Sequence, residues 1–275
     1  MPPARSTAGA APAALAEALA PVRADPARSA ILLDVDGTLA PIVARAEQAH
    51  VPEGTRRLLI EIARRYACVA CVSGRRASDA RRLVSIGTIN YLGSHGVELL
   101  RAGWAEPALD PDVADWARRV GDFARSADQD ELRRLRVRQE DKGAIVAFHW
   151  RGAPDEGAAQ SAMDGLATSA EAAGLRTHWG RKVLEIRPPV RMDKGVGIFS
   201  FLEHAGFDAA LYAGDDATDL DAFRGLDDLV GAGHLRRAVR AGVRSEEGPA
   251  EIAERADVVV EGTEGVVTLL EALLG

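Results

Sequence analysis

Short apolar runs alternate with longer amphipathic segments over most of the chain. Residues 30–34, 67–73 and 90–93 have the length and apolar content of buried strands. Between them, residues 52–66 and 77–84 carry apolar side chains at helical spacing. This alternation of strands and helices predicts a parallel sheet with helices on both faces.

The middle of the chain has a different pattern, in which strand-like segments follow one another directly. We expect a long helix over 112–135, strands over 135–141 and 144–151 joined by a turn at Lys142-Gly143, a helix over 155–173, and strands over 175–179 and 183–187. Neighbouring strands joined by tight turns form antiparallel pairs. The region is therefore predicted to be a small antiparallel sheet that carries two helices.

The strand–helix alternation returns after Pro188-Pro189. The expected elements are a helix over 194–204, a strand over 209–213, a helix over 219–224, shorter strands near Leu229 and Val258, and a closing helix over 266–274. The sequence thus predicts an α/β fold with a doubly wound, parallel-sheet (Rossmannoid) core and one smaller α+β domain inserted into it.

These patterns define the expected domain boundaries. Residues 30–106 and 189–275 are assigned to the core, and residues 107–188 to the inserted cap. Residues 1–29 are rich in Ala, Pro and Arg and lack the Leu-rich stretch of a secretory signal. We expect them to form a flexible tail with one short helix around 13–19.

Composition narrows the class of protein. A chain of 275 residues, 47% of them hydrophobic, can form a core domain and a smaller one. No apolar run approaches the roughly 20 residues that a membrane span needs, which predicts a soluble protein. The net charge of −7 and the pI of 5.5 argue against nonspecific binding to nucleic acid or anionic membranes. An anionic substrate remains compatible with them, because a bound cation can reverse the local field.

The two cysteines, Cys68 and Cys71, form a single C-x-x-C string inside an apolar run. A redox or zinc site would use such a pair, but no second pair follows it. We interpret both as small core residues, and their number fits a reducing cytoplasm.

The strongest chemical signal is the string Asp34-Val-Asp36-Gly37-Thr38-Leu39, directly after a buried strand. Two carboxylates at this spacing can point the same way at the end of a strand, where they repel each other unless a cation lies between them. Gly37 permits a sharp turn, and Thr38 offers a hydroxyl and an amide to a phosphate oxygen. The alternative is an ordinary Asp-Gly-Thr turn.

A second acidic string, Gly214-Asp215-Asp216-Ala-Thr-Asp219, also follows an apolar strand. Because ligand sites of parallel sheets lie at the carboxyl ends of strands, Asp215 is expected to join Asp34 and Asp36 around a hard cation such as Mg²⁺. Taken alone, the string also fits an acidic helix cap.

Two shorter strings complete the set. Ser73-Gly74-Arg75 ends a strand, and the Ser73 hydroxyl can donate to a phosphoryl oxygen. Lys194 opens a helix, where its charge opposes the helix dipole, so an anion is a better explanation for it than helix stability. A solvated surface lysine is the alternative.

The four strings, in this order, resemble the haloacid dehalogenase superfamily from about Ala30 to the end of the chain. The resemblance implies that Asp34 attacks phosphorus and that Asp36 is the general acid and base. It also implies that Mg²⁺ is held by the Asp34 side chain, the Asp36 carbonyl and Asp215, with Asp216 and Asp219 behind these ligands. Ser73 and Lys194 would hold the phosphoryl oxygens.

The insert lies after Ser73 and before Lys194, a position that resembles the sugar-phosphatase and phosphomannomutase branch. Finer strings resemble the trehalose-6-phosphate phosphatase family, namely Gly93 to Glu98, Glu140 to Arg151, Gly180 to Pro188 and Gly214 to Asp219. The resemblance implies phosphate or substrate binding by Gly37, Thr38, Gly74, Arg75, His95, Glu140, Lys142, Arg181, Lys182 and Glu185. A solvated hairpin tip at Glu140 and Lys142 is the alternative for that pair.

Two departures from the family pattern stand out, Leu220 where Glu is usual and Trp150 where Tyr is usual. Leu220 puts in doubt a sugar contact at that position, whereas Trp150 is a similar amphipathic aromatic residue. His95 is expected to contact the substrate or support the site, and His149 to be packed within its strand.

The function implied by the resemblance is hydrolysis of trehalose 6-phosphate, with the cap gating access to the site. Alternatives are another sugar or polyol phosphatase, a phosphomannomutase-like enzyme, or a noncatalytic sugar-phosphate sensor. The expected cofactor is Mg²⁺ and the expected partner a small-molecule substrate, without nucleic acid or membrane. The sequence does not fix the oligomeric state, although a monomer is favoured.

Overall fold

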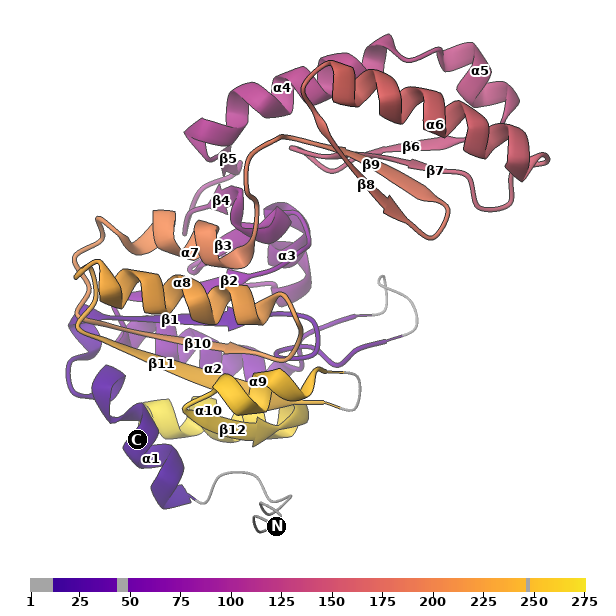
Figure 1. Cartoon of the computed structure of the whole chain (residues 1–275). Coiled ribbons are helices and arrows are strands. Elements are labelled where there is room, and N and C mark those ends of the chain that lie inside the picture. The colour runs from indigo at the N-terminus through magenta and orange to yellow at the C-terminus, as the bar shows by residue number, and fades with distance from the viewer. Residues whose placement is uncertain (1–11, 44–48, 246–247) are drawn as a thin grey trace, which may run out of the picture. The chain divides into compact units, whose positions relative to one another are not determined.

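The computed structural model describes residues 12–43, 49–245 and 248–275, and it divides into two compact units. Unit 1 comprises Met1–Ala108 and Met192–Gly275, and unit 2 comprises Leu109–Arg191. The segments of unit 1 that flank unit 2 in sequence join into one sheet, drawn in indigo and orange in Figure 1.

Unit 1 is built on a sheet with the strand order β12-β11-β10-β1-β2-β3-β4-β5. Its strands are β1 (Ser29–Asp34), β2 (Cys68–Val72), β3 (Asn90–Gly93), β4 (Glu98–Leu100), β5 (Ala108–Leu109), β10 (Ala209–Gly214), β11 (Arg237–Arg244) and β12 (Val258–Glu261). The strands from β12 to β3 pair in parallel, and β4 pairs antiparallel to β3. The carboxyl ends of β1, β10 and β2 therefore meet at one edge, where the predicted motifs begin.

Helices cover both faces of this sheet. One face packs against α1 (Pro12–Arg23), α2 (Glu53–Arg65), α3 (Ala77–Val84) and α10 (Gly262–Leu274). The other packs against α7 (Lys194–Leu202), α8 (Asp219–Gly231) and α9 (Ala250–Arg255). Strand β1 alternates between the two cores, with Ile31 and Leu33 in the first and Leu32 in the second, because successive side chains of a strand point to opposite faces.

Unit 2 is a four-stranded antiparallel sheet, in the order β6-β7-β9-β8, with helices on one face. Its elements are α4 (Pro111–Ser126), α5 (Gln129–Arg134), β6 (Arg138–Asp141), β7 (Val146–His149), α6 (Glu156–Ala172), β8 (Arg176–Gly180) and β9 (Val183–Arg187). Phe148, Leu184 and Ile186 pack with the helices in a core of their own. The fold is thus the predicted doubly wound α/β core with a smaller α+β insert.

The short helix expected around 13–19 is present, but the described part of the N-terminal segment packs on the core instead of forming the flexible tail that we expected. Helix α1 extends over Pro12–Arg23, and Leu15, Leu19 and Val22 are buried against the core. Residues 26–28 form a short 3-10 turn, and Ser29 already belongs to β1. The helix is amphipathic enough to pack, although its composition resembles that of a linker. Residues 1–11 lie outside the described residues.

Two predicted elements were wrong. Leu229 belongs to α8 rather than to a strand, and the strand that follows is β11, whose basic side chains mask its apolar alternation. The long helix expected over 112–135 is two helices, α4 and α5. The break arises because the Asp128 carboxylate accepts hydrogen bonds from the amides of Asp130 and Glu131 and starts a new helix.

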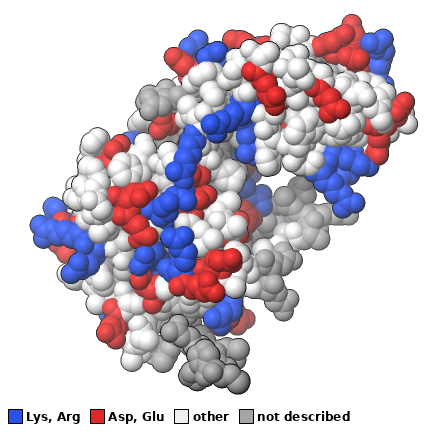
Figure 2. Space-filling model, viewed as in Figure 1, with Lys and Arg blue, Asp and Glu red and all other residues white. Residues whose placement is uncertain are grey.

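Cys68 and Cys71 are buried free thiols, and burial raises the pKa of both thiols. None of the helices in the described ranges is long and apolar enough to cross a membrane. Figure 2 shows acidic and basic side chains interspersed on the face in view. Arg240 and Asp257 form one of the ion pairs of unit 1.

Candidate active site

The site lies at the carboxyl edge of the unit 1 sheet. Asp34 is the last residue of β1, Asp215 follows β10 directly, and Ser73 follows β2. All three side chains are buried. The register of β1 between β10 and β2 brings these strand ends together, as the spacing of the motifs predicts.

Lys194, the first residue of α7, is the cation of the site. Its ammonium donates to Asp34 Oδ1 and to Asp219 Oδ1, each at 2.6 Å. The lysine is only 2% exposed, which excludes the alternative of a solvated surface residue. Burial alone would lower the pKa of Lys194, but Asp34 and Asp219 outweigh it and raise the pKa, so the lysine stays charged.

Asp219 accepts four hydrogen bonds and orders the site. Its Oδ1 accepts from Lys194 and, at 2.5 Å, from the Tyr212 hydroxyl. Its Oδ2 accepts from the amides of Asp215 and Asp216, at 2.7 and 2.9 Å. Because both oxygens are already engaged, Asp219 supports the other carboxylates and has little capacity left for a cation. Asp216 accepts from the Thr218 amide and hydroxyl within the same loop.

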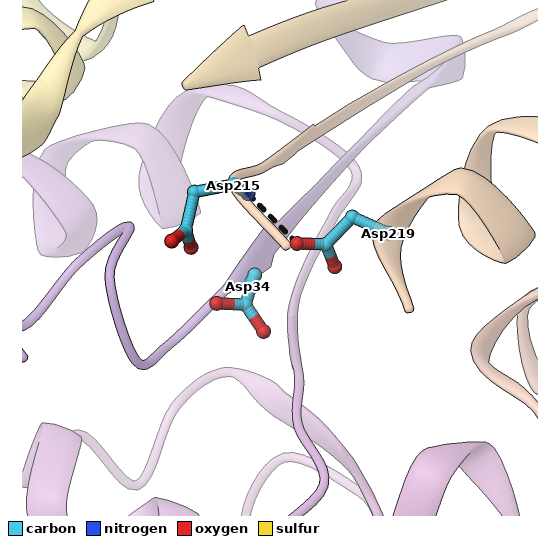
Figure 3. A group of neighbouring side chains, drawn as sticks. All are labelled: Asp34, Asp215 and Asp219. Carbon is cyan, nitrogen blue, oxygen red and sulfur yellow. Dashed lines mark hydrogen bonds between the residues drawn. The ribbon is translucent and has the colours of Figure 1, made fainter. Parts of the chain in front are cut away.

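Three carboxylates converge from β1, β10 and the start of α8, as Figure 3 shows. Asp34, Asp215 and Asp219 each offer an oxygen within 4.8 Å of the others. The Thr38 hydroxyl donates to Asp215 Oδ1 at 3.1 Å. Gly37 has a φ of 89°, and a Cβ there would lie 2.2 Å from Asp215 Oδ2, so the turn requires glycine.

The electrostatics of this group suit a divalent cation. Three carboxylates and the single Lys194 ammonium leave two negative charges uncompensated when all are ionised. Burial, followed by the neighbouring Asp219 charge, raises the pKa of Asp215 to about 6. Burial also raises the pKa of Asp34 well above its usual value, against the opposing effect of Lys194. A hard cation with oxygen ligands would remove this repulsion, so the residues fit the metal that the sequence implies.

The Asp36 side chain pairs with Arg75 and does not belong to this carboxylate group. Its two oxygens accept from Arg75 Nε and a terminal guanidinium nitrogen, both at 2.7 Å. Among the described residues, the carboxylates that cluster are therefore Asp34, Asp215 and Asp219, and the Asp36 side chain lies outside the group. A bidentate ion pair of this kind holds Asp36 and Arg75 in a defined orientation.

Ser73, Gly74 and His95 lie together beside β2 and β3. The Ser73 hydroxyl accepts from the Arg75 amide at 3.1 Å. The His95 imidazole packs over Gly74, where an added Cβ would lie 2.9 Å from the ring. Nearby, the buried Glu98 carboxylate accepts from the Ala77 amide at the start of α3. These contacts fix the loop that carries Ser73.

The predicted sugar-binding residues form a polar cluster in unit 2. The strand register aligns Glu140, Ala147 and Glu185 across β6, β7 and β9, on the sheet face opposite the Phe148 and Leu184 core. Lys142 donates to Glu185 at 3.0 Å. Glu140 contacts His149 Nε2 at 2.8 Å, so this histidine joins the polar face.

The remaining two predicted residues lie at the turn between β8 and β9. The Lys182 ammonium binds the Glu156 carboxylate of α6, at 2.6 Å to Oε1, and Arg181 is exposed. His178 of β8 lies opposite Glu185 of β9. The sequence analysis missed it, because only the strand register brings it to the polar face of unit 2.

Tyr212 is the other residue that the sequence analysis missed. It is fully buried and binds Asp219. The available signal was a tyrosine inside an otherwise apolar strand, two residues before Gly214. A buried phenol needs a hydrogen-bond partner, which points to a polar group behind the strand end.

The fold resembles that of a haloacid dehalogenase-like hydrolase from Bacteroides thetaiotaomicron, with a TM-score of 0.58 at 15% identity over 88% of this chain and 98% of the other. The fold and the carboxylate–lysine site define a protein of the haloacid dehalogenase class. Within that class, the chain belongs to the trehalose-phosphatase family, whose model matches residues 32–254.

Individual relatives agree with this family. A trehalose-phosphate phosphatase of Mycobacterium tuberculosis (strain ATCC 25618 / H37Rv) is 31% identical over 252 residues, covering 83% of this chain and 60% of that protein. A solved trehalose-6-phosphate phosphatase related protein has a TM-score of 0.61 at 25% identity, over 88% of this chain and 95% of the other. The chain spans only 15% to 60% of the length of the curated relatives it matches.

Proposed function

We propose that this chain is a magnesium-dependent phosphatase that hydrolyses trehalose 6-phosphate to trehalose and phosphate. The observation that carries the proposal is the 2.6 Å contact between the buried Asp34 carboxylate and the Lys194 ammonium, beside Asp215. A carboxylate nucleophile next to a fixed cation suits attack on a phosphoryl group. Membership of the trehalose-phosphatase family supports the choice of substrate.

In the first step of the proposed reaction, an Asp34 oxygen bonds to phosphorus while the bond from phosphorus to the sugar oxygen breaks. Asp36 gives its proton to that leaving oxygen, and trehalose departs. Asp36 then accepts a proton from water as the water oxygen attacks the aspartyl-phosphate. The bond between Asp34 and phosphorus breaks, which releases phosphate and regenerates the carboxylate. Asp36 must exchange its ion pair with Arg75 for these contacts.

Several groups of this chain would stabilise the charge that develops on the phosphoryl oxygens. The Ser73 hydroxyl and the Lys194 ammonium donate to these oxygens, and the amides around Gly37 and Thr38 cradle the group. Gly74 allows close approach of the chain, and Arg75 adds a positive charge once it leaves Asp36. Ser73 follows β2 directly and Lys194 begins α7, so these two donors are held in place before the reaction, whereas Arg75 must first leave Asp36.

We propose Mg²⁺ as the cation. Asp34, Asp215 and the Asp36 main-chain carbonyl would hold it, and hard oxygen ligands of this kind suit Mg²⁺ better than softer metals. When bound, Mg²⁺ neutralises phosphoryl charge and orients the group for attack. The two uncompensated negative charges of the carboxylate group support this assignment.

The sugar would be recognised by the polar face of unit 2. We propose that Glu140, Lys142 and Glu185 bind sugar hydroxyls, together with Arg181, Lys182 and His95. The alignment of Glu140 with Glu185 and the ion pair of Glu185 with Lys142 support this role, because they gather charged hydrogen-bonding groups on one sheet face. Leu220 is only partly buried and packs against the second core of unit 1, which gives it no polar contact to offer.

The test is phosphate release from a panel of sugar phosphates with Mg²⁺, for wild type and Asp34→Asn. We expect strong preference for trehalose 6-phosphate and no turnover by the variant, because asparagine keeps the shape but is not a nucleophile. Turnover of other sugar phosphates with equal efficiency would overturn the substrate and favour a broader sugar phosphatase. Binding without phosphate release would favour a sensor, and a requirement for a bisphosphate activator would favour a mutase.

A further inference from the structure

The turn between β3 and β4 has an unusual backbone. Its residues Ser94, His95 and Gly96 (η3) have φ values of 50°, 61° and 96°, three successive left-handed conformations. For the two residues with side chains such conformations cost free energy and persist only where the surroundings impose them. The contacts on both sides of the turn explain what imposes them.

On one side, the turn binds the loop that carries Ser73. The Ser94 amide donates to the Arg75 carbonyl at 2.7 Å, and the His95 amide donates to the Ser73 carbonyl at 3.1 Å. The His95 imidazole covers Gly74 so closely that a Cβ there would lie 2.9 Å from the ring. Two main-chain hydrogen bonds and this packing leave the loop little freedom to shift relative to the turn.

On the other side, the turn packs against α7, three residues beyond Lys194. A Cβ on Gly197 would lie 2.4 Å from the Gly96 Cα, and a Cβ on Gly96 would lie 2.8 Å from the Gly197 Cα. The two main chains thus touch directly, with no room for a side chain on either residue. Figure 1 shows α7 beside β3, in agreement with the contacts between α7 and η3.

We propose that the Ser94–Gly96 turn is a positioning element that sets the separation between Ser73 and Lys194. Ser73 follows β2 and Lys194 begins α7, and the turn contacts the main chain of Ser73 directly and the main chain of α7 at Gly197, three residues beyond Lys194. Its left-handed conformation brings the Ser94 and His95 amides towards one side and the Gly96 main chain towards the other. The inference rests on the proposed function, in which Ser73 and Lys194 donate to the same phosphoryl group.

The test inserts one methyl group at the contact, in Gly197→Ala. The methyl group must push α7 and Lys194 away from the turn, so we expect kcat to fall by about 10- to 100-fold, the cost of a misplacement near 1 Å. We expect KM to change by less than about threefold, since these donors act mainly in the transition state. Inhibition by orthovanadate should weaken by the same factor as kcat/KM, because this probe mimics the transition state.

The matched control is Gly54→Ala in α2, where a Cβ would meet nothing within 4 Å. It should keep wild-type kcat, KM and orthovanadate inhibition. A second variant, Gly96→Asn, places a side chain in the same contact from the turn. Asparagine is chosen because it tolerates the left-handed conformation. It should lower kcat in the same way. Melting temperatures show whether each variant is folded at the assay temperature.

Wild-type kcat in folded Gly197→Ala and Gly96→Asn would overturn the proposal. So would a loss of folded protein in both, because the turn would then serve stability alone. The substrate is judged separately, on the wild-type chain. If wild type prefers another phosphate monoester, the proposed substrate fails, and the same comparison of variants is made with that monoester.

Discussion

At the scale of single residues, Asp219 orders the groups around the carboxylate cluster. Its oxygens accept from Lys194, Tyr212 and two main-chain amides of the Asp215 loop. It thereby fixes the direction of the Lys194 ammonium and of the Asp215 backbone at once. A buried acceptor with four donors is expensive to disturb, since each lost partner leaves a charge poorly solvated.

Tyr212→Phe tests this arrangement. The variant removes one hydrogen bond to a charged, fully buried acceptor and changes nothing else in shape. We expect the free energy of unfolding to fall by about 1.5–3 kcal/mol, measured by urea denaturation. Tyr66→Phe is the control, because the buried Tyr66 hydroxyl donates to a neutral carbonyl, that of Leu273. Tyr66→Phe should lower the free energy of unfolding by about 1 kcal/mol. Equal losses in both variants would contradict the role of Asp219.

Glu185→Gln tests the proposed recognition of the sugar by the polar face of unit 2. Glutamine keeps the size but loses the charge that binds Lys142 and Arg187. We expect KM for trehalose 6-phosphate to rise by about 10- to 100-fold, the value of a hydrogen bond to a charged group. Turnover of p-nitrophenyl phosphate should stay unchanged, because that ester carries no sugar. Glu171→Gln, in α6 on the opposite face of the sheet, should leave both substrates unaffected.

At the scale of elements, α1 shows where composition misleads. Its Ala- and Pro-rich sequence is typical of a linker, yet Leu15, Leu19 and Val22 recur at helical spacing and are buried. The helix contacts α10 and β11, so it covers part of the sheet face that α2 and α10 leave open. The helical spacing of Leu15, Leu19 and Val22 indicates a helix that packs on the core, whereas the composition of the segment does not.

Leu19→Ala measures what α1 contributes. Leu19 is fully buried, so its truncation removes apolar contacts and leaves a cavity. We expect the free energy of unfolding to fall by about 2–5 kcal/mol. Glu17→Ala on the exposed side of the same helix should change it by less than about 0.5 kcal/mol. A similarly small effect of Leu19→Ala would mean that α1 does not stabilise the core.

At the scale of the whole molecule, the carboxylate group links stability to pH and to the cation. The raised pKa of Asp215 means that the folded, cation-free protein holds this proton more tightly than the unfolded chain does. The resulting contribution to stability is present at low pH and is lost as pH rises through about 6. A divalent cation should replace it, because it binds the deprotonated carboxylates.

The rise in Tm on adding Mg²⁺ should therefore be larger at pH 7.5 than at pH 5. Below the pKa of about 6, protons compete with the cation for Asp215. Differential scanning fluorimetry with and without Mg²⁺ at both pH values measures the effect. Asp215→Asn should abolish most of the rise, since it removes a proposed ligand. A rise that is greatest at pH 5 would contradict a site built from these carboxylates.

The sequence by itself determined the class of fold and the chemistry of the core site. Strand–helix alternation, and acidic strings placed directly after apolar runs, are local properties, and in a parallel sheet they bring Asp34, Ser73 and Asp215 to the same edge without further information. The position of the insert between Ser73 and Lys194 is also a property of the chain order. The resemblance to the haloacid dehalogenase superfamily implied the same residues.

Only the tertiary structure decided which partner each side chain takes. The pairing of Asp36 with Arg75, the contact of Asp219 with Lys194 and the contact of Gly96 with Gly197 join residues far apart in the sequence. No local spacing encodes such contacts, because they depend on strand order and on how closely two backbones approach. For the same reason His178 joined the polar face of unit 2 only through the register of β8 with β9.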